Sequence, residues 1–147
     1  MNLLCRFVGL VVLATADFLL FQHVLAQSPG VTATVQFNSG QTVTVTDFSD
    51  PIGVQPGEAV SVSIQFDPSH AGEPLKVGPL DGGEVNGTSI AVSDQGLVTF
   101  TFQADASPGR NRVVVRHGLQ TLLVEFWALS PNPQNNPPVI TPANPEG

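Results

Sequence analysis

The sequence predicts an all-β fold in which two sheets pack as a sandwich. Apolar and polar side chains alternate along most of the chain after Gln27, and this is the period of a strand with one buried face. Gly and Pro, at 14 and 13 residues, are frequent between these stretches, as in chains with many turns. No stretch after Gln27 shows three turns of capped helical periodicity. Together these features are typical of a sandwich of about seven to nine antiparallel strands.

The first two strands, at residues 31–37 and 41–48, form a predicted hairpin around the turn Asn38-Ser39-Gly40. The cleanest alternation is AVSVSIQF, at residues 59–66. Loops are expected at residues 51–57 and 78–87, where Pro and Gly gather. Further strands are predicted at residues 74–77, 88–92, 97–103, 111–116 and 119–129.

Residues 1–26 are predicted to be a signal-peptide helix. A short segment with Arg6 precedes an apolar stretch, and Val24-Leu25-Ala26 suits cleavage after Ala26, with Ala16 as a second possible site. The segment is also long enough to cross a bilayer, so a retained N-terminal membrane anchor is the alternative, although Asp17 would then lie near its centre. We therefore expect a secreted, periplasmic or cell-surface protein.

The lone cysteine and the charge exclude several kinds of function. Cys5 lies in the leader, so the mature chain is expected to lack disulfides, thiol chemistry and cysteine metal sites. A domain of about 100 residues can be held by its hydrophobic core instead. The net charge of −7 disfavours nucleic acid as a partner. It gives no help in binding anionic lipid, so a membrane is expected as a partner only if the leader is uncleaved.

Residues 27–129 are predicted to form one domain, followed by a tail at residues 130–147. The tail contains six prolines and little apolar content, so we expect an extended, largely disordered spacer.

Residues 54–129 resemble bacterial immunoglobulin-like domains of exported proteins. The likeness lies in VQPGEAVSVSIQF, in DQGLVTFTFQADASPGRNRVVV with its A-D-A-x-P-G corner, and in NNPPVIT of the tail, which is similar to joints between modules of large bacterial surface proteins. In many such domains a Tyr follows the Pro-Gly and closes the corner; here Asn111 or a neighbour holds that place. The resemblance implies an immunoglobulin-like sandwich with a structural or adhesive role.

The stretch SPGRNRVVVRHG, residues 107–118, contains three of the five basic residues of the chain. A turn at His117-Gly118 would place Arg116 opposite Leu119. The arginines would then lie on the solvent-exposed face of a hairpin, with Glu125 near them. The same side carries Trp127 and makes a candidate docking patch. A plain solvated face, or a face covered by the first hairpin, is the alternative. The patch comprises Arg110, Arg112, Arg116, Leu123, Glu125 and Trp127.

No catalytic residue, cofactor or metal site is predicted. Ser61 and Ser63 alternate with core positions, and no hydrolase or phosphate-binding motif is present. His70 and His117 lie far apart in the sequence, so zinc would need carboxylates as well. The loop from Asp81 to Asn86 offers oxygen ligands for calcium without the dense acidic run of strong sites, and calcium binding there is left open.

The function expected from these features is that of an exported, non-catalytic structural or adhesive module that binds a protein or a cell surface. A carbohydrate-binding sandwich module is the alternative. One Trp and no Tyr would give such a module a meagre platform for sugars.

Overall fold

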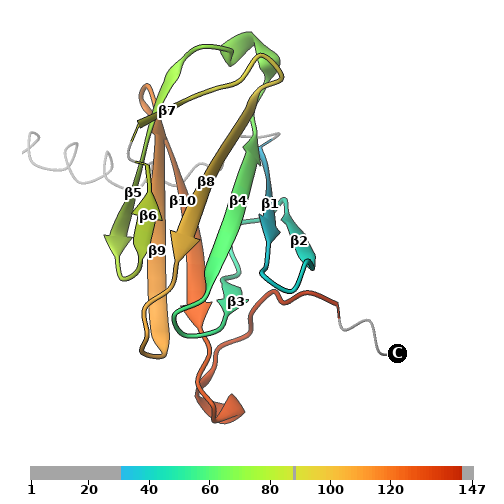
Figure 1. Ribbon diagram of the computed structural model, residues 1–147, viewed down its shortest axis with the longest axis vertical. Helices are drawn as coiled ribbons and strands as arrows, with labels where there is room; N and C mark the ends of the chain where they lie inside the picture. Colours follow the sequence, from blue (N-terminus) through green and yellow to red (C-terminus); the bar gives the residue numbers. More distant parts are fainter. Residues whose placement is uncertain (1–30, 88, 144–147) are drawn as a thin grey trace, which may run out of the picture.

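The computed structural model describes residues 31–87 and 89–143, so the predicted leader lies outside the described residues. This part of the chain forms two five-stranded sheets packed face to face (Figure 1). Its helices are two single 3-10 turns, η1 (Pro68–His70) and η2 (Pro133–Asn135). No helix within these residues has the length and apolar character needed to span a membrane. The predicted all-β sandwich is confirmed.

The first sheet, sheet A, has the order β2-β1-β4-β8-β6, and the second, sheet B, has the order β3-β10-β9-β5-β7. All neighbouring strands are antiparallel except β3, which runs parallel to β10. The strands of sheet A are β1 (Thr32–Gln36), β2 (Thr42–Val45), β4 (Ala59–Gln65), β6 (Glu84–Asn86) and β8 (Leu97–Gln103). Those of sheet B are β3 (Ile52–Val54), β5 (Pro74–Asp81), β7 (Ser89–Ala91), β9 (Gly109–His117) and β10 (Gln120–Ala128).

This strand order is that of an immunoglobulin-like domain. Strands β1, β4, β8 and β6 take the places of A, B, E and D, while β10, β9 and β5 take those of G, F and C. The described residues contain ten strands rather than seven to nine, because β3 and β6 are three-residue strands within the predicted loops. Strand β5 also continues to Asp81, four residues beyond the predicted end.

The core lies between the two sheets and is filled by the alternation seen in the sequence. Val60, Val62 and Ile64 of β4 face Val113, Val115 and Val124 of sheet B, and all six are buried. The rings of Phe102 and Phe126, one from each sheet, stack with centroids 4.2 Å apart. This stacked pair joins the two layers near the middle of the core.

The β9–β10 hairpin has a different register from the one predicted. His117 pairs with Gln120, so the turn residues are Gly118 and Leu119 rather than His117 and Gly118. Gly118 has φ of 58°, which a glycine adopts without steric cost, and Leu119 is fully exposed at the tip. Because the cross-strand partners shift by two residues, every side chain keeps the predicted face.

Asn111 closes the corner where related domains use a tyrosine. Its side chain is buried, with 1% of its surface exposed. The Oδ1 atom accepts a hydrogen bond from the amide of Asp105 at 2.9 Å, and Nδ2 donates to the carbonyl of Gly109 at 3.1 Å. The amide side chain thus links both arms of the corner between β8 and β9.

Residues 130–143 fold back onto the sandwich beside β3 (Figure 1), which differs from the disordered spacer expected from composition. The amide of Gly53 donates to the carbonyl of Ile140, and the amide of Ile140 donates to the carbonyl of Pro51, both at 2.9 Å. Gly53 has no side chain, and this lets Val139 lie close over the strand. The tail therefore pairs with the edge of β3 that β10 leaves free. Residues 144–147 lie outside the described part.

Candidate functional site

The six residues of the predicted docking patch lie on the outer face of sheet B. Along β9, Asn111, Val113 and Val115 are buried, so the residues between them point away from the core. The register places Arg112 opposite Glu125 and Arg110 opposite Trp127. We call this surface the arginine face; it comprises Lys76, Arg110, Arg112, Val114, Arg116, Leu123, Glu125 and Trp127.

One arginine of this face is held in place by an acid that the sequence did not associate with it. Arg112 Nε donates to both carboxylate oxygens of Asp81, at 2.9 and 3.0 Å, and Nη2 donates to one of them as well. The ladder between β5 and β9 is irregular between Pro79 and Asp81, and this irregularity brings Asp81 opposite Arg112. The sequence suggested Glu125 as the partner of an arginine, and Glu125 contributes only a weaker attraction to Arg112.

The hydrogen bonds from Arg112 hold the pKa of the Asp81 carboxyl below its ordinary value, and burial opposes this change only in part. The same hydrogen bonds raise the pKa of Arg112. Both groups therefore stay charged at neutral pH. The pair fixes the guanidinium on the sheet surface, since a forked arginine–carboxylate contact has a defined geometry.

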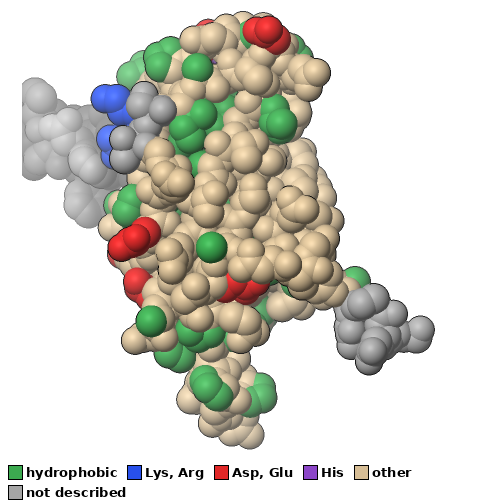
Figure 2. All heavy atoms as spheres, in the orientation of Figure 1, with side chains coloured by type: hydrophobic (Ala, Val, Ile, Leu, Met, Phe, Trp, Pro, Cys, Tyr) green, Lys and Arg blue, Asp and Glu red, His purple; other side chains and the backbone are tan. Residues whose placement is uncertain are grey.

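The arginine face gathers every Lys and Arg of the described residues. Lys76 of β5 is the register partner of Arg116, so two cations lie side by side at one end. Arg112 occupies the middle, and Arg110 the other end, beside Trp127. Between the cations, Val114, Leu123 and Trp127 are partly exposed. On the side of the molecule drawn in Figure 2, by contrast, Lys and Arg appear only at one edge.

The acidic loop considered for calcium is divided between the two sheets. Asp81 belongs to sheet B and is paired with Arg112, whereas Glu84 and Asn86 belong to β6 of sheet A. The amide of Gly83 donates to Asp105 at 2.9 Å, which ties the crossover to the corner. These contacts explain the loop as a connection between sheets, and calcium binding there stays a question for titration.

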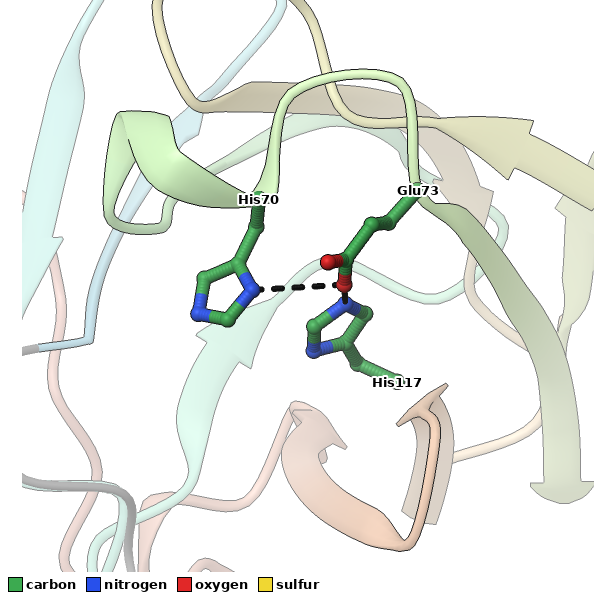
Figure 3. Close-up of side chains that lie close together, drawn as sticks. All are labelled: His70, Glu73 and His117. Carbon is green, nitrogen blue, oxygen red and sulfur yellow. Dashed lines mark hydrogen bonds and ion pairs between the residues drawn. The ribbon is translucent and has the colours of Figure 1, made fainter.

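A second cluster, which the sequence did not reveal, lies at the end of the sandwich where the turn of β9 and β10 is located. His70, Glu73 and His117 meet there, and the carboxylate lies between the two imidazoles (Figure 3). His70 Nδ1 is 3.2 Å from Glu73 Oε2, and His117 Nε2 is hydrogen-bonded to the same oxygen. The two rings are in edge contact, with centroids 4.6 Å apart. We call these residues the His–Glu–His cluster.

The strand alternation that fills the core also builds this cluster. His117 ends β9 on the same side as Val113 and Val115, and Glu73 precedes β5 on the same side as Leu75 and Val77. His70 ends η1, which connects β4 to β5. Asp67 caps the start of η1, and its carboxylate accepts from the Ser69 amide at 2.8 Å. The sequence does contain a signal for this cluster, because Glu73 and His117 continue the inward-facing positions of the neighbouring strands β5 and β9. That signal was missed because both residues lie at the ends of the alternating stretches.

The hydrogen bond from His117 lowers the pKa of the Glu73 carboxyl, and a second one from His70 acts in the same direction. His117 is largely covered, with 11% of its side-chain surface exposed, and its ring lies against Phe66. His70 and Glu73 are open to solvent. The cluster thus presents two imidazole nitrogens and an ionised carboxylate at the surface, and among the described residues it is the only set of three such groups at metal-ligand spacing.

Neither a family model nor a curated protein matches this sequence. Two solved structures are similar in fold. The D00-D0 domain of intimin is 17% identical over 71% of this chain and 66% of that chain, with a TM-score of 0.47. A C-terminal 282-residue fragment of intimin, in complex with the intimin-binding domain of the translocated intimin receptor, is 12% identical over 48% of this chain and 27% of that chain, with a TM-score of 0.40.

The chain therefore spans less than two thirds of either of these structures. Its own strand order, with the A-B-E-D and G-F-C arrangement in separate sheets, identifies it as an immunoglobulin-like β-sandwich domain.

Proposed function

We propose that the chain is an exported, non-catalytic immunoglobulin-like module that binds a protein partner through the arginine face. One observation carries this proposal: all four cations of the described residues lie on one face of a chain whose net charge is −7. The strands β5, β9 and β10 contain these four cations and two acids, Asp81 and Glu125, so this part of sheet B has a net positive charge. A cationic surface on an acidic protein selects a partner surface of opposite charge and orients it.

The structure of the face suits binding rather than catalysis. Val114, Leu123 and Trp127 give an apolar centre that a partner can desolvate, and Trp and Arg are the residue types that dominate protein interfaces. Arg112 is already ordered by Asp81, so it would lose little freedom on binding. Arg110 and Arg116 are exposed at the two ends, where charges steer the approach of a partner.

The remaining parts of the chain take supporting roles in this proposal. Residues 1–26 direct export, with cleavage after Ala26, and residues 27–129 form the binding domain. The tail begins at residue 130, and its Ile140 pairs with Ile52 of β3.

The test compares two double variants with the wild-type protein. Arg110→Glu/Arg116→Glu reverses two exposed cations, and Thr42→Glu/Thr101→Glu adds acids at exposed positions of sheet A. Proteins crosslinked to the chain on the surface of its own cells are quantified by mass spectrometry. We expect the arginine variant to lose a defined partner by roughly tenfold, the threonine variant to retain it, and the wild-type complex to weaken as salt is added.

Equal partner recovery with both variants would contradict the arginine face as the binding surface. A glycan array tests the alternative, a carbohydrate-binding module. The structure favours a protein partner, because the large hydrophobic side chains that are well exposed in residues 31–87 and 89–143 are leucines and not aromatic rings. Those leucines are Leu80, Leu97 and Leu119.

A further inference from the structure

The His–Glu–His cluster has the donor set of a transition-metal site. We propose that His70 Nδ1, His117 Nε2 and the carboxylate of Glu73 together bind one divalent zinc-type ion. His117 directly follows Arg116 in β9, but its side chain points to the opposite side of the strand, so the site uses no residue of the arginine face.

The three donor atoms already converge on one point. They all lie within 4.8 Å of one another, and His70 Nδ1 is 3.2 Å from the Glu73 oxygen. In a tetrahedral zinc site with bonds of about 2.0–2.1 Å, neighbouring donor atoms are separated by roughly 3.3 Å. The hydrogen bond between His117 and Glu73 would have to open to admit the ion. Small side-chain rotations suffice for this, because the carboxylate is at the surface.

Backbone contacts hold two of the ligands in position before any ion binds. The amide of Glu73 donates to the carbonyl of His70 at 3.0 Å, and the carbonyl of Glu73 accepts from Val92 at 3.0 Å. The His117 ring is packed against Phe66 at the end of β9. A site with this degree of order costs little conformational entropy to occupy.

The charge of the cluster also suits a cation. The Glu73 carboxylate lies between two imidazoles, each of which presents a nitrogen to it. A divalent ion can take the place of the protons that now join these groups, because imidazole binds metals through a deprotonated nitrogen.

The donor atoms discriminate between classes of metal. Two imidazole nitrogens with one carboxylate suit zinc and its neighbours in the transition series. Calcium and magnesium prefer oxygen ligands in larger number, so they should not bind here. Three protein ligands leave one position for water, and the exposure of His70 and Glu73 makes that position accessible to solvent.

Occupancy would link two distant parts of the chain. His70 and Glu73 belong to the connection from β4 to β5, while His117 belongs to the hairpin of β9 and β10. The unfolded chain does not hold these ligands together, so an ion that binds the folded state raises the melting temperature. This gives a readout that requires no knowledge of the partner or the activity.

The experiment titrates the full chain with zinc, calcium and magnesium by calorimetry and follows the melting temperature. We expect one zinc per chain, a melting temperature that rises with zinc concentration, and no response to calcium or magnesium. His70→Ala and Glu73→Gln should each abolish both effects. Glu84→Gln, which removes an exposed acid from β6, and Cys5→Ser, which removes the leader thiol, should behave as the wild type.

Cobalt(II) gives an independent signature, since a tetrahedral site with nitrogen and oxygen ligands yields visible absorption bands that His70→Ala should remove. His70 is on the surface turn η1, so this variant is expected to fold even if changes at His117 do not. Absence of zinc binding by the wild type would overturn the proposal. Zinc binding that persists unchanged in both His70→Ala and Glu73→Gln would overturn it as well.

Discussion

The outer faces of the two sheets are chemically different although their inner faces are alike. In sheet A, the strands β1, β2, β4 and β8 contain no charged residue, and their outward positions are mostly Thr, Ser and Gln. In sheet B, β5 and β9 carry all the cations of the arginine face. The same period-two pattern thus builds one core and two surfaces of different character: the inward positions determine the fold, and the outward positions carry the proposed binding surface.

The outer face of sheet A is built from uncharged polar contacts. Ser63 and Thr99 lie opposite each other and share a hydrogen bond of 3.1 Å, which is a neutral cross-strand contact. On the outer face of sheet B, by contrast, the side chains of Arg112 and Asp81 form a forked ion pair. The two outer faces therefore differ in the kind of cross-strand contact that they contain, neutral in sheet A and ionic in sheet B.

The largest expected effect on stability concerns the core-facing sides of the two sheets. Removing a large apolar side chain from either sheet should lower the free energy of unfolding by a similar amount. Phe102→Ala and Phe126→Ala each remove one ring of the stacked pair and leave a cavity between the layers. Each should lower the free energy of unfolding by about 3–5 kcal/mol. Urea unfolding followed by tryptophan fluorescence measures both.

The matched controls change one outward threonine in each of the two strands that carry these phenylalanines. Thr101→Ala in β8 and Thr121→Ala in β10 should alter the free energy of unfolding by less than about 0.5 kcal/mol. If one phenylalanine proved as tolerant as the threonines, the two sheets would not share a single core, and the comparison of their outer faces would lose its basis.

The alternation of the sequence was sufficient to predict most strands because a strand with one buried face leaves a period-two signal. Strands β1, β4 and β8 lie within about a residue of the predicted bounds. The short strands β3 and β6 were missed, since three residues carry no period and their pairing depends on neighbours distant in sequence. The hairpin register was displaced because two adjacent turn positions were both plausible, and tertiary context selected Gly118 with Leu119.

The next largest effect concerns the one buried polar side chain among the described residues. Asn111→Ala removes an acceptor for Asp105 and a donor for Gly109, and it leaves both backbone groups without that partner. Partly buried backbone groups that lose their partner are costly, so the free energy of unfolding should fall by about 1–3 kcal/mol. Asn86→Ala, at an exposed position of β6, is the control and should have little effect.

Hydrogen exchange sharpens this prediction, because it distinguishes a local opening from a general loss of stability. The amide of Asp105 should exchange much faster in Asn111→Ala than in the wild type. Unchanged protection of that amide would mean that the corner is closed by other contacts, and the comparison with a tyrosine corner would then be wrong.

Of the candidate sites, the arginine face was accessible from the sequence and the His–Glu–His cluster was not. Arg110, Arg112 and Arg116 alternate within one strand, so their common face follows from the pleat alone. His70 and His117 come from separate elements, and only the packing of η1 across the end of both sheets brings them to one carboxylate. The tail was misjudged for a similar reason: Pro and Asn composition indicates the absence of a core but not the free edge of β3, to which Ile140 binds.

The smallest expected effect returns to the outer face of sheet B and asks whether its charges serve stability. Asp81→Asn breaks the pair with Arg112 and should lower the melting temperature at neutral pH only slightly, because both side chains are partly exposed and water screens them. Since the pKa of Asp81 is lowered in the folded state, its carboxylate stabilises the fold above its ordinary pKa of 3.8. That contribution is lost as the pH falls through the lower folded-state pKa.

The melting temperatures of wild type and Asp81→Asn should therefore converge on acidification below the ordinary pKa of this carboxyl, and remain apart above it. Asp94→Asn, which removes an acid from the turn before β8, controls for the change in net charge. A large loss of stability at neutral pH in Asp81→Asn would make the ionic pair a structural element. A small loss would mean that the pair orders Arg112 without contributing much to stability, as the proposed binding surface requires.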